Sequence, residues 1–302
     1  MSQIAKRPAI HRNADPEKVI KDLQSHLLSS FSYLENTSKS AVLFSGGVDS
    51  SLAALLTKQH CKDTLLITAR CEDSHDARVS KRAAKAMSLD LVEATIDSET
   101  VWEVIPEVTQ LIKKTDRMNV EIAIPFFLAA QEAHRLGFGT MVSGQGPDEL
   151  FGGYARYERM FIESGSEAVE AALWNDYSVT DEANIKRDRN VIEYHKLKPF
   201  FPYLHPEFAA CALSIPAVMN IDPKKKPARK LMFRKLAAVM GVPKNVAMEQ
   251  KRATQYSSGT SKMLVQSIIE HIPTLSKQSK RSVEVHMDEI LEKINRQQSV
   301  EE

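Results

Sequence analysis

The feature that most constrains the fold is a regular alternation between short apolar runs and helical stretches in the first half of the chain. Apolar runs with β-branched residues occupy 41–44, 64–68 and 91–96, and helical stretches at 50–59 and 77–87 separate them. This order is typical of parallel strands joined by right-handed crossovers, with helices on both faces of the sheet. The sequence therefore predicts an α/β fold built on a doubly wound parallel sheet.

The rest of the chain adds helices to this sheet. A helix is predicted at 16–34, before the first strand, because its apolar residues recur at helical spacing. Two further helices at 98–114 and 122–136 lead to a short strand at 140–143, and strand signals almost vanish after Gly153. Helical periodicity then recurs at 166–174, 206–213, 229–240 and 283–294.

Composition excludes several classes of protein. The chain has 302 residues, of which 43% are hydrophobic, and its 40 basic residues nearly balance 39 acidic ones. The net charge therefore gives no indication that the protein binds nucleic acid or a membrane. The three scattered cysteines fit reduced thiols, and no apolar run is long enough to cross a bilayer. We expect a cytoplasmic protein that does not enter a membrane.

A first glycine-rich loop at 45–51 follows a predicted strand and opens a helix, where backbone N–H groups and the helix dipole favour an anion. Gly46 and Gly47 let the backbone approach phosphate oxygens, and Asp49 suits a bound Mg²⁺. The loop lacks the lysine of kinase-type phosphate loops, which disfavours γ-phosphoryl transfer and suits a leaving pyrophosphate. A glycine-rich turn without function is the alternative. The loop's hydroxyl donors are Ser45, Ser50 and Ser51.

A second glycine-rich loop at 143–154 follows a later strand. Because parallel strands bind ligands at their carboxyl ends, the two loops are expected to form one site. Asp148 is then the natural second carboxylate for Mg²⁺, opposite Asp49.

Together the two loops resemble the synthetase domain of class B asparagine synthetases and relatives such as β-lactam synthetase, which are pyrophosphatase-loop (PP-loop) ATPases. The resemblance covers about 41–259 and includes both loops, 187–189, 201–204 and 255–259. It implies an adenine nucleotide α-hydrolase-like fold and an ATP-dependent, AMP-forming carbon–nitrogen ligase. In this family aspartate and ammonia become asparagine, AMP and pyrophosphate.

The resemblance also implies roles for individual residues and parts of the chain. Mg²⁺ is expected at Asp49 and Asp148, adenine at Leu43 and Ala69, phosphates at Ser45, Gly46, Gly47, Ser50 and Ser51, and the ribose and α-phosphate at Ser143 and Gly144. A lysine that stabilises charge at the α-phosphate corresponds to Lys251 or Arg252, and we favour Lys251. We expect an N-terminal helical extension (1–38), a PP-loop domain (39–153), a helical part completing the site (154–275) and a charged C-terminal helix or tail (276–302).

Two departures fall where the acceptor is expected. Gln145 replaces a glutamate of the family, and an amide cannot accept a proton from an incoming amine as a carboxylate can. If the chain makes asparagine, restoring that carboxylate is expected to raise ammonia-dependent turnover. Lys198 stands where the family has an acidic residue, and we expect it on the acceptor side of the site. Ser2 stands where the family's glutaminase has its cysteine, so we expect free ammonia, another amine, or ammonia from a separate glutaminase subunit.

Other readings stay open at this point. A basic stretch in the second half could bind RNA, and related loops occur in enzymes that adenylate tRNA bases. We favour a small-molecule amino-acid carboxylate, because few aromatic residues are interleaved and no zinc cysteines occur. Another carboxylate, a nucleotide-binding descendant without catalysis and a homodimer are the remaining alternatives. The basic stretch comprises Lys224, Lys225, Lys226, Arg229, Lys230, Arg234, Lys235, Lys244, Lys251 and Arg252, opposed by Asp222 and Glu249.

Overall fold

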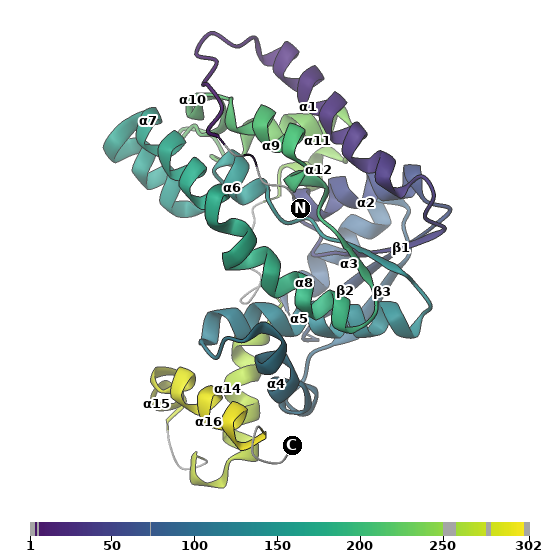
Figure 1. The fold of residues 1–302 in the computed structure, drawn as a ribbon, viewed down its shortest axis with the longest axis vertical. Helices are drawn as coiled ribbons and strands as arrows, with labels where there is room; N and C mark the ends of the chain where they lie inside the picture. The colour runs from purple at the N-terminus through teal and green to yellow at the C-terminus, as the bar shows by residue number, and fades with distance from the viewer. Residues whose placement is uncertain (1–3, 5, 73, 250–257, 276–278, 299–302) are drawn as a thin grey trace.

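A five-stranded parallel sheet lies at the centre of the computed structural model, which describes residues 4, 6–72, 74–249, 258–275 and 279–298 (Figure 1). The strand order is β3-β2-β1-β4-β5, and every neighbouring pair is parallel. The doubly wound α/β class predicted from the sequence is confirmed. The strands are β1 (Lys39–Leu43), β2 (Asp63–Arg70), β3 (Leu91–Thr95), β4 (Thr140–Val142) and β5 (Lys198–Phe200).

Helices between the strands cover both faces of the sheet. Helix α2 (Val48–His60) packs against β1, β2 and β4, and α3 (His75–Met87) packs against β2. The chain then crosses back through α4 (Ser98–Ile112) and α5 (Arg117–Arg135), and α5 packs against β1, β2 and β3. Right-handed crossovers in opposite directions along the sheet place these two helix pairs on opposite faces.

Strand β5 was not predicted. It pairs Lys198 with Thr140 and Phe200 with Val142 at the edge of the sheet. The strand has only three residues, too few to show the alternation of a typical strand. One of them is Pro199, which has no N–H to donate to a neighbouring strand. The edge position accommodates the proline.

The N-terminal helix follows its sequence signals closely. Helix α1 runs from Pro16 to Phe31 and continues into a 3₁₀ turn, Ser32–Leu34, so the predicted helix is confirmed. The Asp15 carboxylate accepts a hydrogen bond from the backbone N–H of Glu17 at 3.1 Å, and Pro16 occupies the first turn. Most of its apolar side chains, including Leu23 and Leu27, are buried, and α1 packs against the helices α9 and α11, described next.

In the second half of the chain, the described residues form helices and turns apart from β5. Helix α14 packs against α4 and α5, and α9 and α11 pack against α1. One continuous cluster of buried apolar side chains runs from Val19 to Ile294. The elements are α6 (Pro147–Phe151), α7 (Ala155–Thr180), the π-helical η2 (Asp181–Ile185), α8 (Lys186–Tyr194), η3 (Pro202–Leu204), α9 (Pro206–Leu213), α10 (Ala217–Asn220), α11 (Leu231–Val239), α12 (Lys244–Ala247), α14 (Thr260–His271), η4 (Pro273–Leu275), α15 (Lys280–Val285) and α16 (Met287–Gln298).

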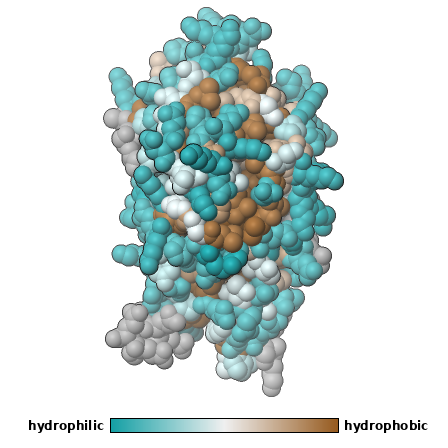
Figure 2. All heavy atoms as spheres, turned by 90° about the vertical axis from the view of Figure 1, so that its right-hand side faces the viewer, coloured by the Kyte–Doolittle hydropathy of each residue, from teal (hydrophilic) through white to brown (hydrophobic). Residues whose placement is uncertain are grey.

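Hydrophilic and apolar side chains both reach the surface. Figure 2 shows one face on which hydrophilic side chains frame a central apolar area. Within the described ranges, no helix combines the length and the apolar character needed to cross a membrane. Cys61, Cys71 and Cys211 are free thiols, as the sequence predicted.

Candidate functional site

The two glycine-rich loops meet at the topological switch point of the sheet. Strand β1 pairs with β2 on one side and with β4 on the other, so the loops that follow β1 and β4 leave the sheet side by side. Their backbones are in contact, because a Cβ added to Gly144 would lie 2.9 Å from the backbone nitrogen of Ser50. Open parallel sheets bind ligands at this position.

The first loop is folded back on itself by its own hydroxyl groups. The backbone N–H of Ser45 donates to the hydroxyl of Ser50 at 3.3 Å, and the N–H of Gly47 donates to the hydroxyl of Ser45 at 3.4 Å. The Ser50 hydroxyl donates to the carbonyl oxygen of Gly47 at 3.2 Å. These contacts hold the turn that contains Gly46 at the N-terminus of α2, where an anion is stabilised.

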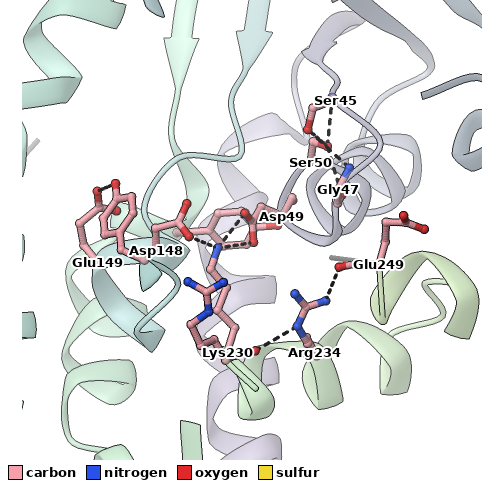
Figure 3. A network of polar contacts seen from close by, with 12 residues as sticks. Ser45, Gly47, Asp49, Ser50, Asp148, Glu149, Lys230, Arg234 and Glu249 are labelled. Atoms are coloured by element: carbon pink, nitrogen blue, oxygen red, sulfur yellow. Dashed lines mark hydrogen bonds and ion pairs between the residues drawn. The ribbon is translucent and has the colours of Figure 1, made fainter. Parts of the chain in front are cut away.

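A buried cation bridges the two carboxylates that the sequence assigned to a metal (Figure 3). The Lys230 ammonium lies 2.9 and 2.8 Å from the carboxylate oxygens of Asp49 and 2.8 Å from a carboxylate oxygen of Asp148. Lys230 is only 2% exposed and precedes α11. Gly153 makes room for this cluster, because an added Cβ there would lie 1.8 Å from Asp148 Oδ1 and 2.2 Å from Lys230 Cε.

The two carboxylates of this carboxylate–lysine cluster (Asp49, Asp148 and Lys230) are suitable ligands for Mg²⁺. Both carboxylates converge on one position, and carboxylate oxygens are the ligands that Mg²⁺ prefers. No group of three or more His, Cys, Asp or Glu side chains in the described part of the chain could hold a metal ion. A pair of carboxylates suits Mg²⁺ that is also held by nucleotide phosphates.

Two cavities that share no lining residue adjoin the cluster. The loop cavity, of about 80 Å³, is bordered by Asp49, and the basic cavity, of about 220 Å³, is bordered by Asp148 and Lys230. The loop cavity is also lined by Leu43, Phe44, Ser45, Ser50, Thr68, Ala69, Pro125, Phe126, Ser143, Gly144 and Gln145. The basic cavity is also lined by Val48, Gly153, Glu158, Pro223, Lys225, Lys226, Pro227, Ala228, Arg229 and Arg234.

Most residues predicted to contact the nucleotide therefore come together at the loop cavity. Ser51 does not, because its side chain is fully buried in α2, lines neither cavity, and its hydroxyl has no hydrogen-bond partner among the described residues. The predicted residues Lys251 and Arg252 lie outside the described residues.

Gln145 lines the loop cavity, and its side chain is hydrogen-bonded to Asp188. Its side-chain Nε2 donates to a carboxylate oxygen of Asp188 at 3.0 Å. Asp188 is fully buried, and burial raises the pKa of its carboxyl group, while the adjacent Arg187 guanidinium opposes this shift. The sequence analysis assigned no role to Asp188 beyond its membership of the resembling stretch at 187–189.

The expectation for Lys198 is wrong. The two loops leave the sheet at the carboxyl ends of the strands, whereas Lys198 pairs with Thr140 at the opposite, amino end of β5. Its ammonium lies 4.4 Å from the centroid of the Tyr33 ring, and the residue is exposed. Lys198 therefore does not face the site.

Two further residues support the loops and were not predicted. The hydroxyl of the buried Tyr203 donates to the backbone carbonyl of Asp49 at 2.7 Å, which ties the turn η3 to the first loop. Glu149, next to Asp148, accepts a hydrogen bond from the Tyr154 hydroxyl at 2.6 Å. Burial, and then the charge of Asp148, raise the pKa of Glu149 to about 7.

The basic stretch in the second half is not one exposed surface. Lys230 and Arg234 are 2% and 6% exposed. Arg234 donates to the backbone carbonyl of Ala247 at 2.6 Å. It also donates to the backbone carbonyl of Glu249 at 2.9 Å (Figure 3). Both cations line the basic cavity, which a count of charges along the chain could not reveal.

Comparison with known proteins identifies the family. The asparagine synthase family model matches residues 32–168 and 163–300. The chain belongs to the asparagine synthase family. It is 32% identical over 255 residues to the protein named putative asparagine synthetase 1 (glutamine-hydrolyzing) of Methanocaldococcus jannaschii. This alignment covers 75% of this chain and 47% of that relative. It is 26% identical over 266 residues to the glutamine-hydrolyzing asparagine synthetase of Triphysaria versicolor, covering 83% and 43%.

The family resemblance drawn from the two loops is thus confirmed. The chain spans less than half the length of these two curated relatives. Among solved structures, the NMN synthetase of Francisella tularensis aligns over 94% of each chain with a TM-score of 0.41 and 14% identity.

Proposed function

We propose that this chain activates a carboxylate with ATP and joins it to an amine, releasing AMP and pyrophosphate. The favoured substrates are aspartate and ammonia, with asparagine as product. The observation that carries this proposal is the convergence of Asp49 and Asp148 on one cation, between the loop cavity and the basic cavity.

The loop cavity suits the nucleoside and the α-phosphate. Leu43 and Ala69 present apolar surface and backbone groups at the ends of β1 and β2, as an adenine ring requires. Ser143 and Gly144 approach from β4, close to the first loop. This arrangement supports the contacts that the resemblance implies for the nucleotide.

The basic cavity suits the pyrophosphate that leaves. Negative charge develops on the leaving group, and preorganised cations stabilise it most where water is excluded. Lys225, Lys226 and Arg229 line this cavity together with Lys230 and Arg234. The phosphate loop needs no kinase-type lysine, because these cations approach from the helical part of the chain.

Asp49 and Asp148 would hold Mg²⁺ together with the phosphates of ATP. Bound there, Mg²⁺ neutralises charge on the triphosphate and favours departure of pyrophosphate. The Lys230 ammonium occupies the position between the carboxylates, so nucleotide binding requires it to move aside, from where it can contact phosphate oxygens. Both cavities are smaller than the several hundred Å³ of a typical ligand pocket, which agrees with such a movement.

The alternatives differ in their substrates. A different carboxylate would use the same nucleotide machinery, and a tRNA substrate would need an exposed basic surface, whereas Lys230 and Arg234 are buried. A nucleotide-binding descendant would retain ATP without turnover. A separate glutaminase subunit and a second copy of the chain stay predicted partners.

The test is the identity of the products. The protein is incubated with ATP, Mg²⁺, ammonia and a panel of amino acids, with and without RNA, and AMP, ADP, pyrophosphate and orthophosphate are quantified. We expect AMP and pyrophosphate in equal amounts, dependent on aspartate, and Asp49→Asn serves as the control with strongly reduced turnover. Products limited to ADP and orthophosphate would refute the proposal. ATP binding without turnover would identify the nucleotide-binding descendant.

A further inference from the structure

A directional chain of hydrogen bonds runs from the N-terminus of α5 to the loop cavity. Asn119 Nδ2 donates to both carboxylate oxygens of Asp116, at 3.0 and 2.8 Å. Arg187 Nη1 donates to Asn119 Oδ1 at 3.0 Å, and Arg187 Nε donates to Asp188 Oδ1 at 2.7 Å. Gln145 Nε2 then donates to Asp188 Oδ2 at 3.0 Å. Of the five residues, Gln145 is the one that lines the loop cavity.

The charges at each step fix the orientation of both amides. A carboxylate accepts only, so Asp116 selects the NH₂ group of Asn119 and turns its oxygen toward Arg187. A guanidinium donates only, which suits that oxygen and Asp188. Asp188 then selects the NH₂ group of Gln145. The remaining oxygen of Gln145, Oε1, has no hydrogen-bond partner among the described residues and is available to the cavity.

Burying this series of hydrogen-bonded polar side chains costs desolvation free energy. Asn119, Arg187 and Asp188 are 8%, 3% and 0% exposed. A buried ion pair is weak support for stability, since desolvation offsets much of the attraction. Lys114 also lies near enough to favour the charged form of Asp188. Since this polar network contributes little to stability, its role is to fix the orientation of the Gln145 amide.

We propose that Asp188 is a positioning residue that presents Gln145 Oε1 as a fixed, uncharged acceptor for the attacking amine. This inference rests on the proposed function and names the class of nucleophile: a small amine, ammonia in the first place, used in its unprotonated form. Gln145 Oε1 accepts a hydrogen bond from an N–H group of the amine, which leaves the nitrogen lone pair free to attack. Because an amide oxygen neither takes the proton nor attracts a cation as a carboxylate does, the amine arrives already unprotonated.

The step balances with one proton released. The amine nitrogen forms the C–N bond with the acyl carbon of the adenylate. The bond between that carbon and the phosphate oxygen breaks, and AMP leaves with its electron pair. The nitrogen sheds its surplus proton to water. Gln145 orients the nitrogen throughout and keeps its own protons.

The test exchanges donor and acceptor across the contact. Gln145→Glu alone sets two carboxylates about 3 Å apart, and Asp188→Asn alone leaves Arg187 without its carboxylate. The double variant Gln145→Glu/Asp188→Asn keeps the net charge and reverses the hydrogen bond. We expect each single variant to lower amide formation, relative to ATP–pyrophosphate exchange, by about tenfold, the typical effect of a hydrogen bond to a charged group. The double variant no longer sets two carboxylates against each other, so it should recover part of the loss seen with Gln145→Glu. Recovery stays incomplete, because residue 145 is then charged and Arg187 still lacks its carboxylate.

Two readouts separate the inference from the function. ATP–pyrophosphate exchange with aspartate reports adenylation without the amine, so a parent protein without exchange refutes the proposed function and this inference with it. If exchange occurs and Gln145→Leu has an unchanged KM for ammonia, the inference alone is overturned. Equal loss in the double variant and both singles would also overturn it. In the parent, kcat/KM for total ammonia should rise with pH in proportion to the unprotonated amine.

Discussion

The ammonium nitrogen of Lys230 lies 2.8 Å from Asp148 Oδ1, and the two side chains are 3% and 11% exposed. The same nitrogen contacts both carboxylate oxygens of Asp49. Three charged groups from different parts of the chain thus share one buried position. Removing the lysine leaves two carboxylates facing each other, and adding a divalent cation replaces the lysine's charge.

Lys230→Met should therefore destabilise the protein and make it sensitive to Mg²⁺. An uncompensated buried charge costs about 3 to 5 kcal/mol, so the midpoint of urea unfolding should fall markedly without metal. Mg²⁺ should restore part of that loss in the variant and change the parent little. Lys235→Met, at an exposed position of α11, is the matched control. A variant as stable as the parent and indifferent to Mg²⁺ would show that the carboxylates do not form a cation site.

Gly153→Ala should disrupt the same cluster through space alone. The added Cβ would lie 1.8 Å from Asp148 Oδ1, so either the carboxylate or the loop must shift. We expect a loss of about 1 to 3 kcal/mol of stability together with loss of turnover. Gly139→Ala is the control, because nothing lies within 4 Å of a Cβ at that position. Equal behaviour of the two variants would contradict the close packing of the cluster.

Asp49→Asn and Asp148→Asn should reduce Mg²⁺-dependent turnover by more than about tenfold, the lower range for groups that support a metal site. Each variant keeps one carboxylate for Lys230, so circular dichroism should report an intact fold. Titrating Mg²⁺ at constant ATP should show a raised requirement for metal in both. Asp63→Asn, at an exposed ion pair with Lys39, is the control. Near-normal activity of either site variant at limiting Mg²⁺ would exclude the metal pair.

His195 should make stability fall with acid. Burial lowers the pKa of His195 from 6.5 to about 4, so between these values the unfolded chain binds a proton that the folded protein does not. Stability is complete above pH 6.5 and is lost as the pH falls through this window. His195→Phe, which keeps ring packing against Phe127, should remove on the order of 1 kcal/mol of that loss.

The measurement is the midpoint of urea unfolding at pH 7.5 and pH 5 for both proteins. His11→Gln, at an exposed position, is the control and should retain the acid sensitivity of the parent. An identical pH dependence in the parent and in His195→Phe would contradict the buried neutral imidazole.

The sequence could predict that the two glycine-rich loops meet, because its signals for them are local. Glycine-rich loops after β1 and β4 are contiguous runs, and the parallel sheet brings Asp49 and Asp148 to one edge by its topology alone. Lys230 belongs to a segment whose path around the loops depends on packing of the helical part. In the sequence it was one basic residue among many, marked only by its place just before the apolar run of α11.

The acceptor side shows where local reading fails. Lys198 was placed by its spacing from neighbouring motifs, but β5 puts it at the amino end of the sheet. Gln145 was predicted from the sequence as a departure from the family, but its contact with Asp188 depends on α8 lying beside the second loop. The expectation that Gln145→Glu raises turnover stays a prediction, and the structure adds an argument for the opposite sign, because the new carboxylate would face Asp188 unless that residue is changed as well.

Adenylation of a carboxylate is tested most directly by following an oxygen atom. The parent protein is incubated with ATP, Mg²⁺, ammonia and aspartate whose side-chain carboxylate carries oxygen-18, and the nucleotide products are analysed by mass spectrometry. The account predicts that AMP gains a single labelled oxygen, in step with the release of pyrophosphate. Unlabelled AMP, or label found in orthophosphate together with ADP, would contradict it.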